Sequence, residues 1–149
     1  MINKLEHSNE SMANQIHSIF QNSCKIEAKL IGVSDFPPLL RTTKDIINAK
    51  TRFYGFFEEH CLAAVIELDI SESHLDINSL TVAPSFFRKG IAGKLVDYAL
   101  KSFDVDTARV ETAVANLPAI NLYEKYGFDE FKRWTPSHGI QKLAMSYKS

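Results

Sequence analysis

Two adjacent cations stand directly before a pair of glycines near the middle of the chain. Arg88 and Lys89 precede Gly90 and Gly93, and the small Ala92 lies between the glycines. Small residues at the start of a helix leave its backbone N–H groups open, and the positive end of the helix dipole adds to their attraction for anions. This spacing predicts a site suited to a pyrophosphate, and the competing interpretation is an ordinary loop with solvated charges. The loop lacks the spacing of a P-loop and the three glycines of a dinucleotide-binding unit.

A tyrosine with the potential to move a proton lies in a second segment, residues 114–128. Apolar residues recur there at helical spacing, which predicts a helix with Pro118 in its first turn and Gly127 after its end. The stripe consists of Ala119, Leu122, Tyr123 and Tyr126. A phenol with a pKa of about 10 is neutral at pH 7 and can donate a proton. The alternative is that Tyr123 is a core aromatic residue without a chemical role.

The elements that must position these two segments alternate between helix and strand. A short edge strand at 2–5 and a long amphipathic helix ending at Gly32 come first, and a shorter helix begins near Thr43. The apolar face predicted for the long helix comprises Ile16, Ile19, Phe20, Ser23, Ile26 and Leu30. Three extended segments then follow, joined by short polar turns, which predicts an antiparallel meander; they span 51–57, 61–70 and 75–82.

The remaining elements follow the cation-containing loop. A helix is predicted from Ile91 to about Phe103, and a strand at 109–115 connects it to the helix that contains Tyr123. Two more strands, at 128–134 and 141–147, complete the pattern. Strands, helix, strand, helix and strands in this order predict an α+β fold in which helices pack on a mixed sheet.

Together, the two chemical segments resemble the GNAT superfamily of N-acetyltransferases. That family shows V-x-P-x-x-(Q/R)-x-x-G-(I/V)-(G/A) and, further along, N-x-x-A-x-x-(L/F)-Y-x-x-x-G-F. The matching residues are Val82, Pro84, Gly90, Ile91 and Ala92, then Asn116, Ala119, Leu122, Tyr123, Gly127 and Phe128. The resemblance covers about residues 43–149. It implies a single domain over 1–149, with a mostly antiparallel twisted sheet of about six to seven strands and about four helices.

The resemblance also implies acetyl-CoA as cosubstrate and an amine that attacks its thioester directly in a ternary complex. The residues implied to bind the cofactor are Leu80, Thr81 and Val82 along the pantetheine arm, then Phe87, Arg88, Lys89, Gly90, Ile91, Ala92 and Gly93 around the pyrophosphate, with Asn116, Ala119 and Tyr123. Tyr123 matches the tyrosine that protonates the leaving CoA thiolate in the family.

Two positions depart from the family pattern. Phe87 replaces the usual Gln or Arg, although Arg88 supplies a cation next to it, and Asn78 stands where many members carry a catalytic Glu. An amide does not titrate, so we expect another base. Glu67 is the first candidate, because a partly apolar strand face would raise its pKa. A solvated outer-face carboxylate is an equal alternative for Glu67, and Asp76 or a water molecule is the next candidate.

Composition limits the partners. The 149 residues carry 17 basic and 18 acidic side chains, so the net charge of −1 gives no field that would hold nucleic acid or an anionic membrane. No apolar run approaches the roughly 20 residues of a membrane span, and the N-terminus lacks a signal-peptide core. The two cysteines form no C-x-x-C pair, and the expectation is a cytoplasmic protein with free thiols and no metal site.

The acceptor is expected to be a cationic primary amine: a small molecule, a peptide N-terminus or a Lys side chain. An acidic group of residues would suit it, namely Glu58, Glu59, Glu67, Asp69, Glu72 and Asp76. We expect its site between the first two helices and the last strands. A homodimer is left open. Two other functions compete with this one: a non-catalytic acetyl-CoA sensor, which would need no base, and an unrelated α+β interaction domain, which would bind no CoA.

Overall fold

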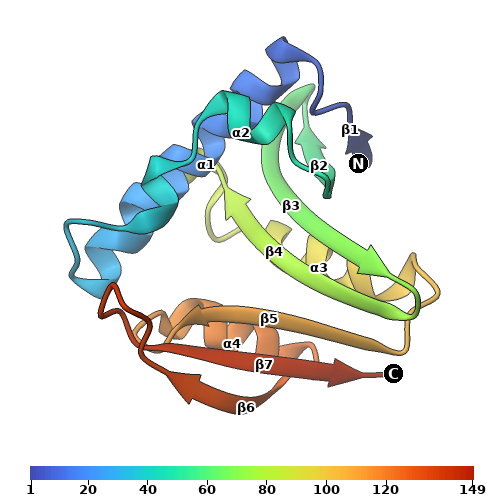
Figure 1. Ribbon diagram of the computed structural model, residues 1–149. Helices are drawn as coiled ribbons and strands as arrows, with labels where there is room; N and C mark the ends of the chain where they lie inside the picture. The colour runs from blue at the N-terminus through green and yellow to red at the C-terminus, as the bar shows by residue number, and fades with distance from the viewer.

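The computed structural model describes residues 1–149, and its centre is a twisted seven-stranded sheet in the order β1-β2-β3-β4-β5-β7-β6 (Figure 1). The strands are β1 (Ile2–Leu5), β2 (Arg52–Glu58), β3 (Cys61–Ser71), β4 (His74–Val82), β5 (Thr107–Ala113), β6 (Asp129–Trp134) and β7 (Lys142–Lys148). Every neighbouring pair is antiparallel except β4 and β5. The predicted meander, the short edge strand and the α+β class are confirmed.

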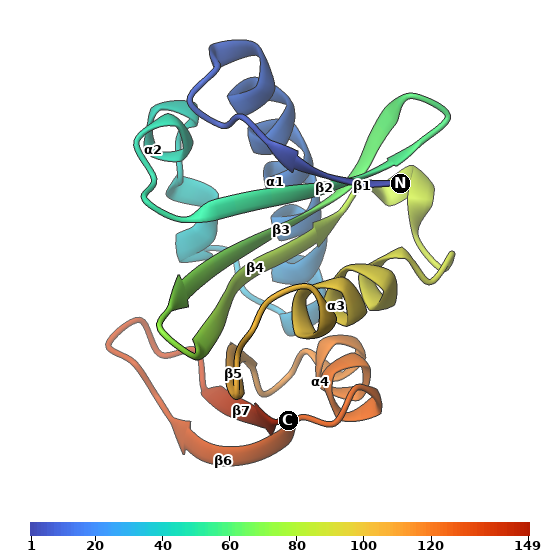
Figure 2. The same ribbon diagram turned by 90° about the vertical axis from the view of Figure 1, so that its right-hand side faces the viewer.

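Helices cover both faces of this sheet (Figure 2). They are α1 (Glu10–Ile31), α2 (Thr43–Ile47), α3 (Ile91–Lys101) and α4 (Leu117–Lys125), with 3₁₀ turns η1 (Pro37–Leu40) and η2 (Pro84–Phe86). The α1 and α2 helices pack on one face, around Ile16, Ile46 and Val65, whereas α3 and α4 pack on the other, around Leu95 and Tyr123. None of these helices combines the length and the apolar character that crossing a membrane requires.

The α1 helix ends at Gly32 as predicted, but its buried face differs from the predicted one. The side chain of Asn9 accepts a hydrogen bond from the Met12 N–H at 3.0 Å, and Gly32 ends the helix with a φ of 76°. Its buried residues are Ala13, Ile16, Ile19, Phe20, Cys24 and Ala28. Ile26 and Leu30, expected to be buried, are 41% and 52% exposed. In its second half, small residues rather than large ones face inward, so the largest side chains do not mark the buried face.

The β3 strand is buried on both faces, which changes the surroundings of Glu67. Ile66 and Leu68 belong to the core on the side of α3 and α4, and Val65 belongs to the core under α1 and α2. Glu67 lies between them in the strand and is only 3% exposed. The alternative of a solvated outer-face carboxylate is therefore wrong, because α1 and the chain around α2 cover that face.

The parallel strands β4 and β5 pair along only part of their length. Residues 74–77 of β4 pair with residues 107–110 of β5, and beyond them the two strands diverge (Figure 1). The register between β3 and β4 shifts at the same level, which leaves Asn78 as the extra residue of a β-bulge. From residue 78 onward, the edge of β4 that faces β5 therefore has no partner strand.

Candidate active site

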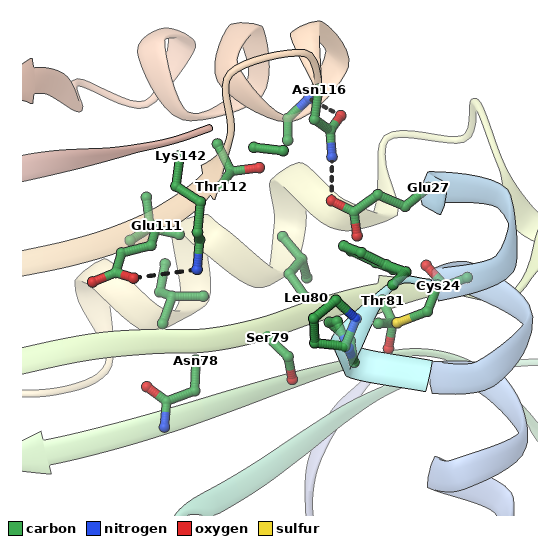
Figure 3. A pocket seen from close by; sticks show the side chains of 18 of the residues that line it. Cys24, Glu27, Asn78, Ser79, Leu80, Thr81, Glu111, Thr112, Asn116 and Lys142 are labelled. Carbon is green, nitrogen blue, oxygen red and sulfur yellow. Dashed lines mark hydrogen bonds and ion pairs between the residues drawn. The ribbon is translucent and has the colours of Figure 1, made fainter. Parts of the chain in front are cut away.

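A cavity of about 540 Å³ opens where β4 and β5 diverge (Figure 3). Its walls come from residues 78–81 of β4, 110–113 of β5, the second half of α1, the start of α4, the chain around η1, and the segment that leads into β7. Cavities of this size commonly hold small-molecule ligands. The expectation that the first helix and the last strands border the acceptor site agrees with this lining, whereas α2 contributes no residue to it.

Glu27 provides a carboxylate on the α1 wall of the cavity. One of its oxygens, Oε2, accepts a hydrogen bond from Asn116 Nδ2 at 2.7 Å, and Glu27 forms no ion pair. Burial raises the pKa of Glu27, while the Asn116 hydrogen bond and the charge of Lys142 partly oppose that rise. The cavity wall thus carries a desolvated carboxylate whose direct partner is a neutral amide.

Asn116 connects this carboxylate to the helix that carries Tyr123. Its Oδ1 caps α4 by accepting the Ala119 N–H at 3.3 Å, while its Nδ2 donates to Glu27 (Figure 3). The Tyr123 ring packs edge-on against Phe128, with 5.5 Å between ring centroids. Burial, and then the charge of Glu27, raise the pKa of Tyr123, so its phenol stays neutral and protonated at neutral pH.

Glu67 lies outside the cavity wall, in a network that satisfies both of its oxygens. Arg41 donates Nη1 to Oε1 at 2.6 Å and Nη2 to Oε2 at 2.9 Å. The Thr51 hydroxyl donates to Oε2 at 2.7 Å, and the Ser79 hydroxyl donates to Oε1 at 3.0 Å. Burial opposes ionisation, but these hydrogen bonds outweigh it and lower the pKa of Glu67. The expectation of a raised pKa at Glu67 is therefore wrong.

Arg41 also fixes the chain between η1 and α2. Its guanidinium lies over the rings of Phe20 and Phe53, at 5.3 and 5.7 Å from their centroids. Its backbone oxygen contacts His17 Nε2 at 3.0 Å and accepts from Gln21 Nε2 at 3.2 Å. The Arg41–Glu67 pair therefore holds the η1 segment, which borders the cavity, against α1 and the sheet.

The predicted pyrophosphate loop lies apart from the cavity, at the start of α3. Arg88 and Gly90 both have left-handed backbones, with φ of 63° and 74°, and no atom would lie within 4 Å of a β-carbon at Gly90. The first N–H groups of α3 have no acceptor within the helix. Gly93 differs, because it is buried and a β-carbon there would lie 2.5 Å from Tyr126 Oη. Gly93 therefore permits the close packing of α3 on Tyr126 and does not open the helix start.

The residues predicted to bind the cofactor fall into two groups. Five of them line the cavity: Leu80, Thr81, Asn116, Ala119 and Tyr123. The others, Val82 and residues 87–93, do not line it. None of the acidic residues expected to attract the amine lines this cavity either; its carboxylates are Glu27 and Glu111. Asp76 borders a smaller neighbouring cavity and contacts His74 Nε2 at 3.0 Å.

Residues 15–128 match the model of the acetyltransferase (GNAT) family. The chain belongs to this family. The family predicted from the two motifs is thereby confirmed.

The chain is also similar in sequence or in fold to individual known proteins. The GNAT chain is 30% identical over 141 residues to the UPF0157 protein YqkA of Bacillus subtilis, which covers 94% of the chain and 41% of YqkA. It is 37% identical over 79 residues to a streptothricin acetyltransferase of Escherichia coli, covering 50% and 45%. The chain thus spans less than half the length of these relatives. The PaiA N-acetyltransferase of Thermoplasma acidophilum, solved with coenzyme A, shares the fold with a TM-score of 0.78, 18% identity and coverage of 100% and 98%.

Glu27 is the residue that the sequence did not reveal. It lies in the long helix, and the apolar face predicted for that helix included the neighbouring Ile26 and not Glu27. The small apolar residues Cys24 and Ala28 could have indicated the buried face of the helix. Glu27 follows Cys24 by three positions and therefore lies close to that face. Such spacing indicates only that Glu27 borders the buried face, not that Asn116 meets it.

Proposed function

We propose that this chain transfers the acetyl group of acetyl-CoA to a primary amine by direct attack in a ternary complex. The observation that carries the proposal is that two groups border one cavity: the neutral phenol of Tyr123 and the carboxylate of Glu27, which forms no ion pair. A proton donor and a proton acceptor in one cavity suit a reaction that loses a proton from an amine and adds one to a thiolate.

The donor fits two features of the backbone. From residue 78 onward, the β4 edge facing β5 offers free N–H and C=O groups, which suit the amides of a pantetheine arm. The open start of α3, with Arg88 and Lys89 beside Gly90, suits the pyrophosphate. In this arrangement the thioester lies near Leu80 and Tyr123, at the inner end of the cavity.

Glu27 receives the acceptor and acts as its base. A cationic amine enters the cavity and places its ammonium at Glu27, which takes one proton, directly or through a water molecule. The raised pKa of Glu27 makes it a stronger base than an ordinary carboxylate. Glu27 replaces Glu67 in this role, because Arg41 already neutralises Glu67 and lowers its basicity.

Acetyl transfer follows the deprotonation of the amine. The free amine attacks the thioester carbon, a C–N bond forms, and the C–S bond breaks. The departing thiolate takes the phenolic proton of Tyr123, and Tyr123 regains a proton from the acylated nitrogen. The products are an acetamide and CoA thiol, and one proton remains on Glu27 until it passes to solvent.

The test is release of CoA thiol from acetyl-CoA against a panel of amines. We expect Tyr123→Phe to lower kcat about 100-fold and to leave the KM for acetyl-CoA unchanged, because the ring packing is kept. Tyr98→Phe is the matched control, since Tyr98 packs against Tyr54 and Phe103 away from the cavity. Thermal stabilisation by acetyl-CoA without thiol release from any amine would instead support a sensor.

A further inference from the structure

A second cavity, of about 340 Å³, adjoins the first where β4 and β5 converge. The two share Ile77, Asn78, Val110, Glu111 and Lys142, so they are neighbours along the two strands. The smaller cavity adds Asp76 and Arg109 and is lined mostly by polar side chains. A molecule bound at Glu27 can therefore extend from the larger cavity into this polar end.

Lys142 borders both cavities, and its ion-pair partner, Glu111, also binds Arg109. Glu111 accepts a hydrogen bond from Arg109 Nη2 at 2.8 Å, and Lys142 Nζ lies at 3.4 Å from the other oxygen of Glu111. One carboxylate thus serves two cations, and the contact to Lys142 is the longer. Asp76, the remaining carboxylate of this end, contacts His74. An ammonium has three donors, so Lys142 keeps the capacity to bind another anion.

The fixed charges of Lys142 and Glu27 come from different sides of the larger cavity. Glu27 projects from α1 toward Asn116, and Lys142 projects from β7 toward Glu111 (Figure 3). The positive charge of Lys142 reaches Glu27, since it opposes the rise in the pKa of that carboxylate. The larger cavity therefore presents the carboxylate of Glu27 on one side and, on the other, the ammonium of Lys142 beside the carboxylate of Glu111.

We propose that the acceptor is a small zwitterion, an amino acid whose ammonium binds Glu27 and whose carboxylate binds Lys142. The assignment rests on the proposed function, because it concerns the acceptor of the same transfer.

Five apolar residues line one part of the larger cavity and indicate the side chain of this amino acid, while Ser23, Thr112 and His138 are among the polar residues of the same wall. The five apolar residues are Phe20, Phe36, Pro37, Pro38 and Ile140. A charged side chain would be desolvated against them without a partner, whereas an apolar one would bury surface. The acceptor is therefore an amino acid with an apolar side chain.

The experiment compares apolar L-amino acids with their carboxamides as acceptors, by thiol release at one pH. The carboxamide keeps the amine and removes the negative charge, and its amine is less basic, so a preference for the acid cannot come from easier deprotonation. We expect the wild type to favour the acid by at least about tenfold in kcat/KM. Lys142→Gln should reduce the acid-to-amide ratio about tenfold.

Lys148→Gln is the matched control, because Lys148 lies on the same strand and borders neither cavity. It should keep the wild-type ratio. Equal use of acids and carboxamides by the wild type would overturn the zwitterion and leave acetyl transfer standing, and this result needs no variant to fold. An unchanged ratio in folded Lys142→Gln would also overturn it. Absence of thiol release with every amine would overturn the proposed function, and the zwitterion with it.

Discussion

Glu27 and Glu67 are carboxylates on the side of the sheet that α1 covers, yet their partners differ in kind. Glu67 receives two hydrogen bonds from a guanidinium and two more from hydroxyls. Glu27 receives one hydrogen bond, from the amide of Asn116. The pKa moves in opposite directions as a result: it is lowered at Glu67 and raised at Glu27.

This difference separates a structural role from a chemical one. A buried carboxylate that already has a cation contributes to folding and has little basicity left for a reaction. A desolvated carboxylate without a cation costs folding free energy, and such groups are typical of binding and catalytic sites. The position of each follows this division, since Glu27 borders the cavity and Glu67 does not.

The largest expected effect is on activity. Glu27→Gln keeps the shape of the side chain and removes its proton-accepting capacity, so kcat/KM at pH 7 should fall about 10³-fold. Activity should recover as the pH rises, because more of the amine is then already free. Glu67→Gln makes the same chemical change outside the cavity and is the matched control. An equal loss in both variants would contradict the distinction between the two carboxylates.

The second effect is on stability and falls on the other carboxylate. Glu67→Gln leaves the Arg41 guanidinium without its counter-charge, and we expect the free energy of unfolding to drop by about 2 kcal/mol. For a chain of this size, that corresponds to a lower Tm by about 4–8 °C. Glu130→Gln, which removes an exposed partner of Arg133, should leave the Tm unchanged. A Glu67→Gln protein as stable as the wild type would show that the network contributes little.

The third effect is the pH dependence of that stability difference. The folded-state pKa of Glu67 is lowered, so its contribution is fully present above the unfolded value of about 4.3. It is lost as the pH falls through the folded-state pKa. The Tm gap between wild type and Glu67→Gln should therefore be constant near neutrality and close in acid. A gap that stays open to pH 2 would mean that packing, and not charge, accounts for it.

The sequence predicted much of this fold because its patterns are local. The meander follows from alternating segments with short turns, and the end of α1 follows from Gly32. The buried face of α1 was not predictable in the same way, since Ile26 and Leu30 are large apolar residues that the tertiary packing leaves exposed. Which side of an amphipathic helix is buried depends on the surface it meets.

In the candidate site, too, local patterns were predictable and contacts between distant residues were not. The two motifs drew attention to Tyr123 and to the loop before α3 because they are contiguous in the sequence. The Glu27–Asn116 bond joins residues 89 positions apart, and Arg41 meets Glu67 across 26 positions. No local pattern indicates either pairing. The sequence analysis therefore predicted Glu67 as the base, although Arg41 neutralises its charge in the structure.

The smallest expected effect reverses the sign seen at Glu67. Glu27→Gln should raise the Tm at pH 7, by about 2–4 °C for a gain of about 1 kcal/mol. The glutamine Oε1 can still accept the Asn116 hydrogen bond, and a neutral amide loses less solvation than a carboxylate in the same place. Because the folded-state pKa of Glu27 is raised, ionised Glu27 lowers stability increasingly as the pH rises from the unfolded value through the folded one.

The gain in Glu27→Gln should therefore be largest at neutral pH and shrink toward pH 4. Thermal melts of wild type and variant across this range measure it, with Glu67→Gln melted alongside under the same conditions. A variant that is both inactive and more stable would show that the ionised carboxylate of Glu27 lowers stability and is needed for activity, as expected of a group that binds a cationic substrate. A lower Tm in Glu27→Gln would instead make Glu27 a structural partner of Asn116, and the two carboxylates would then share one role.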